Sequence, residues 1–379
     1  MKILYFSHSF GSPTTTFIRN ETESFNVSDT IKYICNSLHP GINKPDYVEV
    51  IPFTQNKFLG KIKWWLWKFD LYCGFNNMVF SRNINNSIHQ FKPDIIHCHF
   101  GYEALMLLDN INDFDQQRII IHFHGYDASA MTRKKTYVEK LKYYLSKPNV
   151  YTISCNAYFI DRFKKELHLP ISHSFVLKCG VDTEKLFVPS RLNQGNEQYM
   201  IQVSSLAEKK GQEYTIQAFK KVVAHSEYKN LKLLFTGDGE RKKDLLDLVI
   251  KLNLENNIVF LGTLPPEQVA NYLSKATVFV HHSVTDSAGD MEGIPTAIME
   301  AMALNLPIVS TLHSGIPELV EDGVNGYLVR EKDIDQYALR MIDALKMGMI
   351  PENRVKILNE YSVELHNKLL ANYYKSCIA

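Results

Sequence analysis

Residues 290–303 read Asp-Met-Glu-Gly-Ile-Pro-Thr-Ala-Ile-Met-Glu-Ala-Met-Ala, and this stretch predicts a loop that turns into a buried helix. Gly293 permits backbone conformations that a side chain would forbid, and Pro295 suits the first helical position, where no amide hydrogen is needed. The free backbone amides at such a helix start attract anions, phosphates above all. We therefore expect an anion cradle at Gly293, Ile294, Pro295 and Thr296.

Two carboxylates frame this turn. Glu292 precedes the helix, and Glu300 lies inside it on an otherwise apolar segment. A carboxylate in apolar surroundings is costly unless it is hydrogen-bonded, so Glu300 is expected to hold hydroxyls or amides of a ligand. A cradle with two acceptors beside it suits a sugar diphosphate. From the residues alone, a plain helix start with a solvated Glu292 and a backbone-paired Glu300 fits as well.

Further residues extend the pattern into that of a known family. Two glutamates separated by seven residues, with Glu-Gly-Ile-Pro opening the helix and Glu-Ala-Met-Ala continuing it, resemble the retaining glycosyltransferases of family 4, and the pattern continues through residues 306–311, 313–320 and 322–329. The resemblance covers most of the chain. It is nearest to transferases that build bacterial exopolysaccharide, capsule and O-antigen, such as the colanic acid transferases. It implies an α/β protein of the GT-B fold, with two Rossmann-like domains facing each other across a cleft.

Bulk composition is compatible with such an enzyme. The 379 residues suffice for two domains, and 42 Lys and Arg against 41 Asp and Glu give no sign of a nucleic-acid partner. The six cysteines form no Cys-x-x-Cys pair, so neither a zinc site nor a disulfide framework is predicted, and reduced thiols fit the cytoplasm. No apolar run approaches the roughly 20 residues that span a bilayer.

Strand-like runs alternate with helix-like runs, which predicts parallel sheets. The first strand, over residues 3–7, is followed by a loop containing Gly11 and by a helix that Thr16 caps. Ligands bind at the carboxyl ends of such strands, although a plain connection is the alternative. In the family this loop carries a glycine near the donor phosphates, which makes Gly11 a donor-side candidate and Thr16 an acceptor-side candidate.

Two later strands end in histidines, over residues 93–101 and 119–127. A strand histidine is more often structural than catalytic, but His124 stands at a strand end beside a glycine. The His-Gly-x-Asp pattern resembles that of the family, whose histidine contacts the donor sugar, and this implies the same role for His124. Asp127 is a candidate contact for acceptor or sugar hydroxyls, and His99 is an acceptor-side candidate with an open role.

Residues 57–72 have the most unusual composition in the chain. At about 100° per residue, lysines fall on one face of a helix, and tryptophan, phenylalanine and isoleucine fall on another. This pattern is typical of a helix lying in a membrane interface, and a helix packed on its own domain is the alternative. The predicted membrane-surface residues are Lys57, Lys61, Trp64, Trp65 and Lys68.

The crossing between the domains is predicted near residues 180–195. This gives an N-terminal acceptor-side domain over 1–182 and a C-terminal donor domain over 183–352. A terminal helix over about 353–379 is expected to pack back on the first domain.

The second domain opens with a strand over residues 200–205 and a basic turn, in which Lys210 could place its ammonium on a phosphate. A solvated lysine is the alternative. In the family an arginine five residues earlier also contacts the donor diphosphate. Ser205 holds that place here, so a cation that would stabilise the leaving phosphate is missing, and Lys209 is the candidate substitute. The resemblance makes Leu261 a candidate contact to the nucleobase.

The resemblance implies a role for each of these groups. Lys210 and the cradle neutralise the diphosphate, Glu300 accepts ribose hydroxyls, and Glu292 accepts hydroxyls of the donor sugar. The predicted function is retaining transfer of a sugar from a UDP- or GDP-sugar to a lipid-linked oligosaccharide acceptor in bacterial surface polysaccharide biosynthesis. No metal or other cofactor is predicted. The enzyme is expected in the cytoplasm or peripherally on the inner face of the cytoplasmic membrane.

Two other functions stay open. Ser205 leaves room for a nucleotide-sugar-binding protein without turnover, and a GT-B-fold nucleotide-sugar epimerase is the alternative enzyme.

Overall fold

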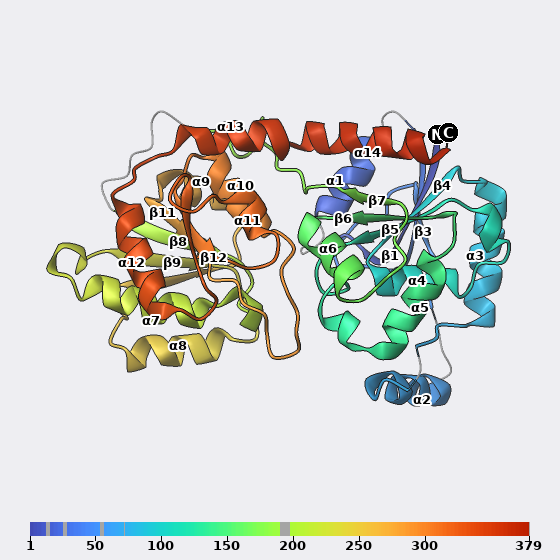
Figure 1. Cartoon of the computed structure of the whole chain (residues 1–379), viewed down its shortest axis with the longest axis horizontal. Helices are drawn as coiled ribbons and strands as arrows, with labels where there is room; N and C mark the ends of the chain where they lie inside the picture. The colour runs from blue at the N-terminus through green and yellow to red at the C-terminus, as the bar shows by residue number, and fades with distance from the viewer. Residues whose placement is uncertain (13–15, 26–28, 54–56, 72, 190–197, 379) are drawn as a thin grey trace. The chain divides into compact units, whose positions relative to one another are not determined.

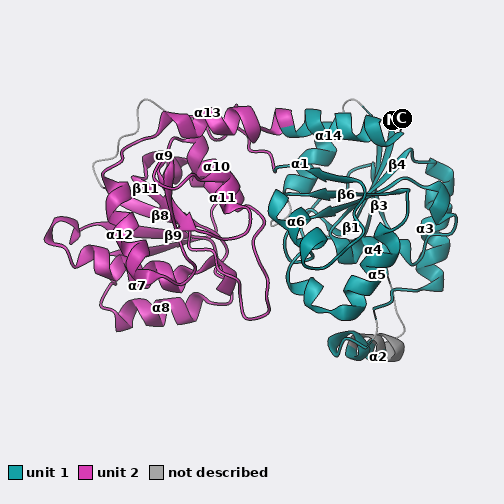
Figure 2. Cartoon of the chain, viewed as in Figure 1, with its two compact units in different colours: residues 1–178, 366–379 teal, residues 179–365 magenta. Residues whose placement is uncertain are grey.

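The computed structural model describes residues 1–12, 16–25, 29–53, 57–71, 73–189 and 198–378, except for the side chains of residues 16, 57–60, 63 and 64. The chain forms two compact units, shown in Figure 2. Unit 1 contains residues 1–178 and 366–379, and unit 2 contains residues 179–365. The first crossing therefore falls shortly before residue 182, and the chain returns to unit 1 after residue 365.

Unit 1 is built on a parallel sheet. Its described strands lie in the order β3-β2-β1-β4-β5-β6-β7, and every pairing is parallel. The strands are β1 (Lys2–Phe10), β2 (Thr30–Leu38), β3 (Val48–Val50), β4 (Ile95–His99), β5 (Ile119–Phe123), β6 (Val150–Ser154) and β7 (Ser174–Val176). All residues of β4 and β5 are buried, as expected for strands covered on both faces.

Helices cover both faces of this sheet, as Figure 1 shows. The helices of this unit are α1 (Thr16–Phe25), α2 (Lys57–Lys68), α3 (Met78–Phe91), α4 (Gly101–Leu108), α5 (Lys135–Leu145) and α6 (Ala157–Lys165), with the short turns η2 (Phe114–Gln116) and η3 (Ala130–Arg133). Of these, α2 stands apart from the sheet. The last helix, α14 (Val363–Ile378), returns to this unit and buries Leu370, Tyr374 and Cys377 in a core shared with β1 and β2.

The terminal helix expected over about 353–379 is two helices in the structure. α13 (Pro351–Glu360) belongs to unit 2, where Ile357 is fully buried in the core. The break falls at Tyr361, whose φ of −136° leaves the helical region. The next residue, Ser362, pairs with Val181 in an isolated bridge.

Unit 2 repeats the architecture with a parallel sheet in the order β10-β9-β8-β11-β12-β13. Its strands are β8 (Tyr199–Val203), β9 (Lys232–Thr236), β10 (Ile258–Gly262), β11 (Val278–Val280), β12 (Ile308–Thr311) and β13 (Gly326–Val329). Its other helices are η4 (Glu208–Lys210), α7 (Gln212–Val223), η5 (Ser226–Tyr228), α8 (Lys242–Lys251), α9 (Pro266–Lys275), α10 (Thr296–Ala303), α11 (Ile316–Leu319) and α12 (Ile334–Leu345). Helix α10 is the most deeply buried of these, because alanine, isoleucine and methionine fill its inner face.

Candidate functional site

The predicted loop and helix are present at the start of α10. Helix α10 begins at Thr296, and Pro295 precedes it with φ −60° and ψ 118°, so Pro295 lies one residue before the first helical position. Gly293 is not among the glycines with a positive φ. Gly293 therefore does not use the positive-φ conformations that glycine permits. Residues Gly293, Ile294 and Pro295 are buried, and Thr296 is exposed.

A cluster of four charged side chains lies beside this turn. Lys210 Nζ is 2.8 Å from Glu292 Oε1, and Lys209 Nζ is 2.8 Å from Asp290 Oδ2 and 3.6 Å from Glu292 Oε1. Burial alone would raise the pKa of Glu292, but the ammonium groups of Lys210 and Lys209 hold it well below its ordinary value. Burial would lower the pKa of Lys209, and the carboxylates of Glu292 and Asp290 raise it. Lys209 and the Glu292 carboxylate are therefore both charged at neutral pH.

A histidine that the sequence analysis did not assign fixes the backbone of Glu292. The Glu292 N–H donates to His313 Nε2 at 3.0 Å, and His313 Nδ1 lies 2.6 Å from Glu331 Oε1. Because a carboxylate only accepts, Nδ1 carries the proton and Nε2 is the acceptor. His313 lies two residues after the end of β12, at the carboxyl edge of the sheet, and this position is the signal that could have found it.

His281 is a second residue that sequence reasoning missed. It follows β11 and is fully buried, and neither ring nitrogen has a hydrogen-bond partner among the described residues. Burial, and then the charge of Lys210, lower its pKa to about 3. A buried neutral imidazole with two free nitrogens can donate one hydrogen bond and accept another. It is therefore a further candidate for contact with a ligand.

Glu300 is partly buried in the middle of α10. No hydrogen bond or ion pair to its carboxylate is found in the part of the chain that the structure describes. Burial raises its pKa to about 7. The alternative in which Glu300 pairs with a nearby backbone group is therefore not what the structure shows. The two other donor candidates of unit 2 lie at strand ends: Ser205 is exposed, and Leu261 in β10 is half-buried against the core.

In unit 1, His124 directly follows β5 and is partly exposed. Its Nε2 lies 3.1 Å from Nδ1 of the fully buried His99. Asp127 is also fully buried, and its carboxylate accepts the backbone N–H groups of Gly101 at 2.7 Å, His124 at 3.0 Å and Gly125 at 3.1 Å. The expectation that Asp127 meets acceptor or sugar hydroxyls is therefore wrong. Asp127 instead holds the turn that presents His124.

The loop after β1 contains Gly11 with φ +83°, and an added Cβ would lie 2.7 Å from Ile42 Cγ1. A side chain at this position would therefore strain the backbone and meet a neighbour. Helix α1 begins at Thr16. The predicted cap depends on the side chain of Thr16, which lies outside the described residues.

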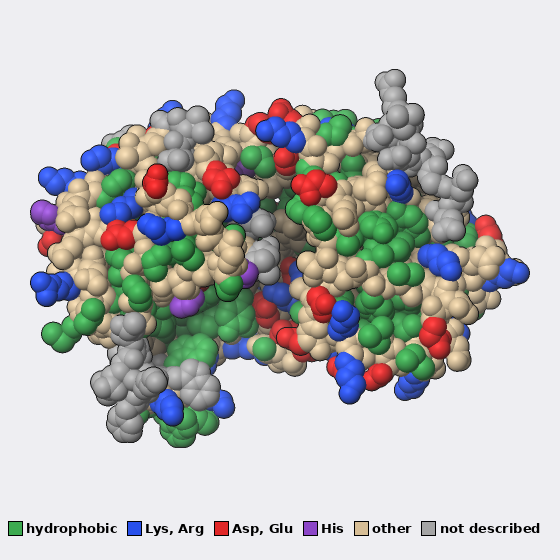
Figure 3. All heavy atoms as spheres, turned by 180° about the vertical axis from the view of Figure 1, so that it is seen from behind, with side chains coloured by type: hydrophobic (Ala, Val, Ile, Leu, Met, Phe, Trp, Pro, Cys, Tyr) green, Lys and Arg blue, Asp and Glu red, His purple; other side chains and the backbone are tan. Residues whose placement is uncertain are grey.

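Helix α2 has an open apolar face. Ile62, Trp65 and Phe69 are 43%, 55% and 54% exposed, and Lys61 and Lys68 are also exposed. The opposite side is held by Trp67, whose ring lies 4.3 Å below Lys134 Nζ. Figure 3 shows basic and hydrophobic side chains together at this protruding segment, at the lower left of the view. The side chains of Lys57 and Trp64 lie outside the described residues.

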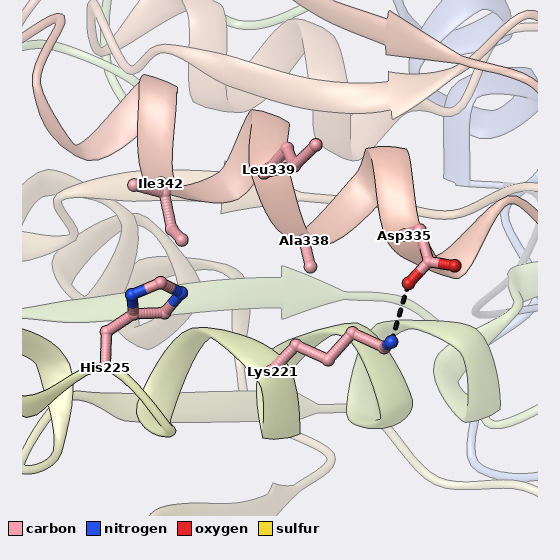
Figure 4. A pocket seen from close by; sticks show the side chains of 6 residues that line it. All are labelled: Lys221, His225, Asp335, Ala338, Leu339 and Ile342. Carbon is pink, nitrogen blue, oxygen red and sulfur yellow. Dashed lines mark hydrogen bonds and ion pairs between the residues drawn. The ribbon is translucent and has the colours of Figure 1, made fainter.

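A hollow of about 260 Å³ lies between α7 and α12 (Figure 4). It is lined by Lys221, His225, Asp335, Ala338, Leu339 and Ile342. Its ion pair, between Lys221 and Asp335 at 2.6 Å, is solvent-exposed, and none of the predicted site residues lines the hollow. We therefore regard it as a surface groove between two helices and not as the donor site.

The chain contains two Asp-x-Asp tripeptides, the spacing that metal-dependent transferases use. In one of them, Asp333 caps α12 by accepting the Gln336 N–H at 3.0 Å, and Asp335 pairs with Lys221. In the other, Asp113 and Asp115 are exposed at η2. The first tripeptide thus has a structural role at a helix start.

Comparison with known proteins identifies the family. Residues 184–362 match the model of the glycosyl transferases group 1. WcaL of Salmonella typhimurium, whose name assigns it to colanic acid biosynthesis as a glycosyltransferase, is 31% identical over 304 residues, which is 78% of this chain and 74% of WcaL. The chain belongs to the group 1 glycosyltransferases. AmsK of Erwinia amylovora, an amylovoran biosynthesis glycosyltransferase, is 30% identical to this glycosyltransferase over 303 residues, 74% of this chain and 70% of AmsK.

A more distant relative has a name that states its donor and acceptor. The UDP-Gal:α-D-GlcNAc-diphosphoundecaprenol α-1,3-galactosyltransferase of Escherichia coli is 25% identical to this glycosyltransferase over 290 residues, 72% of each chain.

Solved structures confirm the fold of this glycosyltransferase. Sucrose-phosphate synthase from Thermosynechococcus elongatus superposes with a TM-score of 0.77 at 17% identity, covering 99% of this chain and 98% of the synthase. HepE of Anabaena, in complex with UDP-glucose, has a TM-score of 0.75 at 18% identity, covering 99% of this chain and 100% of HepE. The predicted GT-B architecture of two α/β units is therefore confirmed. In the described part of the chain, no helix is both long and apolar enough to cross a bilayer.

Proposed function

We propose that this glycosyltransferase moves a sugar, with retention of anomeric configuration, from a uridine diphosphate sugar to a lipid-linked glycan in bacterial surface polysaccharide biosynthesis. The observation that carries the proposal is the cluster of Lys209, Lys210 and Glu292 beside the start of α10, with the unpaired Glu300 inside that helix. The names of WcaL and AmsK support the polysaccharide pathway.

In the charge cluster, the diphosphate of the donor can replace Glu292 as the partner of Lys210. In the free protein Glu292 neutralises Lys210. A diphosphate offers Lys210 and Lys209 an anion of higher charge, and the backbone amides at the start of α10 add partial positive charge. Glu292 is then released to accept hydroxyls of the donor sugar. Glu300 accepts the ribose hydroxyls, and His124 contacts the sugar near the reacting carbon.

The proposed reaction needs no protein base. The acceptor hydroxyl attacks the anomeric carbon from the face that the phosphate leaves. The bond from that carbon to the phosphate oxygen breaks, and this oxygen takes the acceptor proton. Catalysis then consists of positioning and of charge stabilisation by Lys210 and Lys209. No metal ion is assigned to the step.

The acceptor and its location rest on two observations. The Escherichia coli relative acts, by its name, on a sugar linked to diphosphoundecaprenol. Helix α2 exposes aromatic and basic residues together, which fits peripheral docking of this cytoplasmic enzyme on the inner face of the cytoplasmic membrane. The UDP-glucose complex of HepE and the UDP-Gal donor of the relative support uridine over guanosine.

Thermal unfolding with UDP, GDP, ADP and their sugar conjugates, without metal, tests the donor. We expect stabilisation by uridine compounds, because a ligand at 100 times its Kd adds about 2.7 kcal/mol. Transfer is then followed with a synthetic diphosphoprenol-linked sugar as acceptor. Absence of a shift with every nucleotide would overturn the proposal. A shift without transfer would favour a binding protein, and conversion of the donor without an acceptor would favour an epimerase.

A further inference from the structure

Behind His124, unit 1 buries a cluster of ionisable side chains that the proposed function does not use. They come from four elements that cover or form the sheet: Glu21 from α1, His97 and His99 from β4, His122 from β5, and His366 from α14. Glu21 is 3% exposed, and His97 and His99 are fully buried. Burial of this many polar groups is costly unless their hydrogen bonds are satisfied, so the direction of each bond is informative.

His366 pairs with Glu21. His366 Nδ1 lies 2.7 Å from the carbonyl oxygen of Lys178, and its Nε2 lies 3.2 Å from Glu21 Oε2. Carbonyl and carboxylate oxygens only accept, so both nitrogens carry protons. Burial would lower the pKa of His366, but the Glu21 carboxylate raises it. His366 and Glu21 thus form a buried ion pair.

The second oxygen of Glu21 faces His99. Glu21 Oε1 lies 3.7 Å from His99 Nε2 and 3.7 Å from His97 Nδ1. His97 Nδ1 has another partner, the Tyr374 hydroxyl at 2.5 Å, whereas His99 Nε2 and Glu21 Oε1 have no hydrogen-bond partner among the described residues. A negative charge beside a neutral imidazole favours the tautomer with its proton on the nearer nitrogen, so His99 carries its proton on Nε2.

The tautomer of His99 determines which ring nitrogen of His124 donates a hydrogen bond and which accepts one. With its proton on Nε2, His99 has a bare Nδ1, and Nδ1 lies 3.1 Å from His124 Nε2. His124 must then donate from Nε2, which leaves its own Nδ1 as an acceptor. We propose that Glu21, held by His366, is a positioning residue that acts through His99 to present His124 Nδ1 as a hydrogen-bond acceptor for a hydroxyl of the donor sugar. The tautomer is a property of this chain alone, and the contact with the sugar rests on the proposed function.

The same histidines could be taken for a metal site, because one nitrogen each of His97, His99 and His122 lies within 4.8 Å of the others. Nitrogens on a tetrahedral zinc ion lie about 3.4 Å apart, given bonds of about 2.1 Å. Both nitrogens of His97 already have hydrogen-bond partners. The rings of His97 and His99 are stacked, with centroids 4.4 Å apart, so their lone pairs do not converge. The contacts therefore favour a hydrogen-bonded ladder.

The tautomer is measured first in the unmodified protein, by long-range ¹H–¹⁵N NMR with ¹⁵N-labelled histidine. The His124 signal is assigned by its loss in His124→Gln. We expect the pattern of a neutral ring protonated at Nε2. A ring protonated at Nδ1 would overturn the proposal, and this readout needs no active enzyme and no variant at Glu21.

Glu21→Gln then tests the effect on transfer. The neutral amide can donate to His99 Nε2, so the ladder can reverse and leave His124 protonated at Nδ1. We expect kcat to fall by about 100-fold, the lower end of the loss caused by removing one preorganised hydrogen bond in an active site, while KM for the donor changes little. A folded variant with the wild-type kcat, or with His124 still protonated at Nε2, would overturn the proposal.

Tyr374→Phe is the matched control. Tyr374 is fully buried beside the same cluster, but its hydroxyl contacts His97 and Tyr5 and not His99. We expect lower stability with unchanged kcat and an unchanged His124 signal, and an equal loss of kcat in both variants would reduce Glu21 to a structural role. If the wild type transfers no sugar from any donor, the proposed function fails while the NMR result still decides the tautomer.

Discussion

Lys210 Nζ lies 2.8 Å from Glu292 Oε1, and this contact joins η4 to the loop before α10. The two residues lie far apart in the sequence and come from separate βα connections of unit 2. In the free protein the Glu292 carboxylate therefore pairs with the Lys210 ammonium group, which a diphosphate would bind.

A double-mutant cycle tests this pair. Lys210→Met leaves Glu292 with only Lys209 at 3.6 Å, so the free energy of unfolding should fall by up to about 3 kcal/mol, and donor binding should weaken. Adding Glu292→Met removes the unpaired charge, so stability should recover while transfer stays absent. The control is Lys221→Met, whose exposed pair with Asp335 should contribute less than about 1 kcal/mol. Chemical denaturation measures all of these values, and additive losses in the double mutant would contradict the prediction.

Lys209 should supply the cation that Ser205 does not. Its ammonium lies within the same cluster, 2.8 Å from Asp290, so Lys209→Ala should lower kcat/KM at least about 10-fold through lost charge stabilisation. Ser205 is exposed and leaves room for a longer side chain. Ser205→Arg should therefore restore part of the activity of Lys209→Ala. Steady-state kinetics of the wild type, Lys209→Ala, Ser205→Arg and the double variant test whether Lys209 supplies the cation. A Lys209→Ala enzyme with full activity would assign the cation to another residue.

Glu300 should make donor binding depend on pH. Its pKa of about 7 in the free protein arises from burial. Ribose hydroxyls donate stronger hydrogen bonds to the ionised carboxylate than to the protonated carboxyl group, so binding should weaken below about pH 7 and release a proton there. Calorimetric titration in two buffers of different ionisation enthalpy at pH 6 measures that proton. Glu300→Gln should bind donor weakly at every pH and release none, and equal proton release by this variant would assign the effect to another group.

The same shift predicts a change in stability. A raised carboxyl pKa means that, between pH 4.5 and about 7, the folded protein holds a proton that the unfolded chain has released. The contribution of Glu300 to stability therefore falls as the pH rises through this window. Relative to the wild type, Glu300→Gln should gain stability between pH 4.5 and 7.5 in urea unfolding. A constant difference across that range would contradict the sign.

Helix α2 should bind anionic membranes. Replacement of Trp65 and Phe69 by serine removes the exposed aromatic pair, whose rings lie 4.4 Å apart, and should reduce sedimentation with phosphatidylglycerol vesicles. Ile250→Ser is the control, because Ile250 in α8 is 59% exposed but lies in unit 2. Added salt should weaken the binding of the wild type, since lysines attract the lipid charge. Equal sedimentation of all three proteins would remove α2 as the docking surface.

Transfer should be insensitive to chelation. We expect the same rate after dialysis against EDTA as after addition of Mg²⁺, because the charge on the leaving diphosphate is assigned to Lys209 and Lys210. Loss of activity that Mg²⁺ restores would contradict this, and Asp113 and Asp115 would then be the first residues to replace, since they are the exposed Asp-x-Asp pair without a capping role.

Much of this protein could be predicted from local sequence. The strand predicted over residues 200–205 lies within two residues of β8, and a strand or helix end places Glu292, Lys210 and His124 at the edges where ligands bind. Strands β2, β3 and β7 of unit 1 were not predicted. Strands β3 and β7 have three residues each, and three residues carry too little periodicity. The terminal helix was predicted as one piece, since only the bridge between Val181 and Ser362 marks its interruption.

The sequence by itself determined the fold class, the family and the identity of the acidic and basic groups at α10, because these depend on patterns within short stretches. The tertiary structure decided which groups meet. It paired Lys209 with Asp290 and brought His313 within hydrogen-bond distance of the Glu292 N–H group. It also buried Asp127 among backbone amides and left the aromatic face of α2 exposed to solvent. Each of these outcomes depends on side chains brought together by the packing of separate elements or on the burial of a whole face, and neither is encoded in the spacing of neighbouring residues.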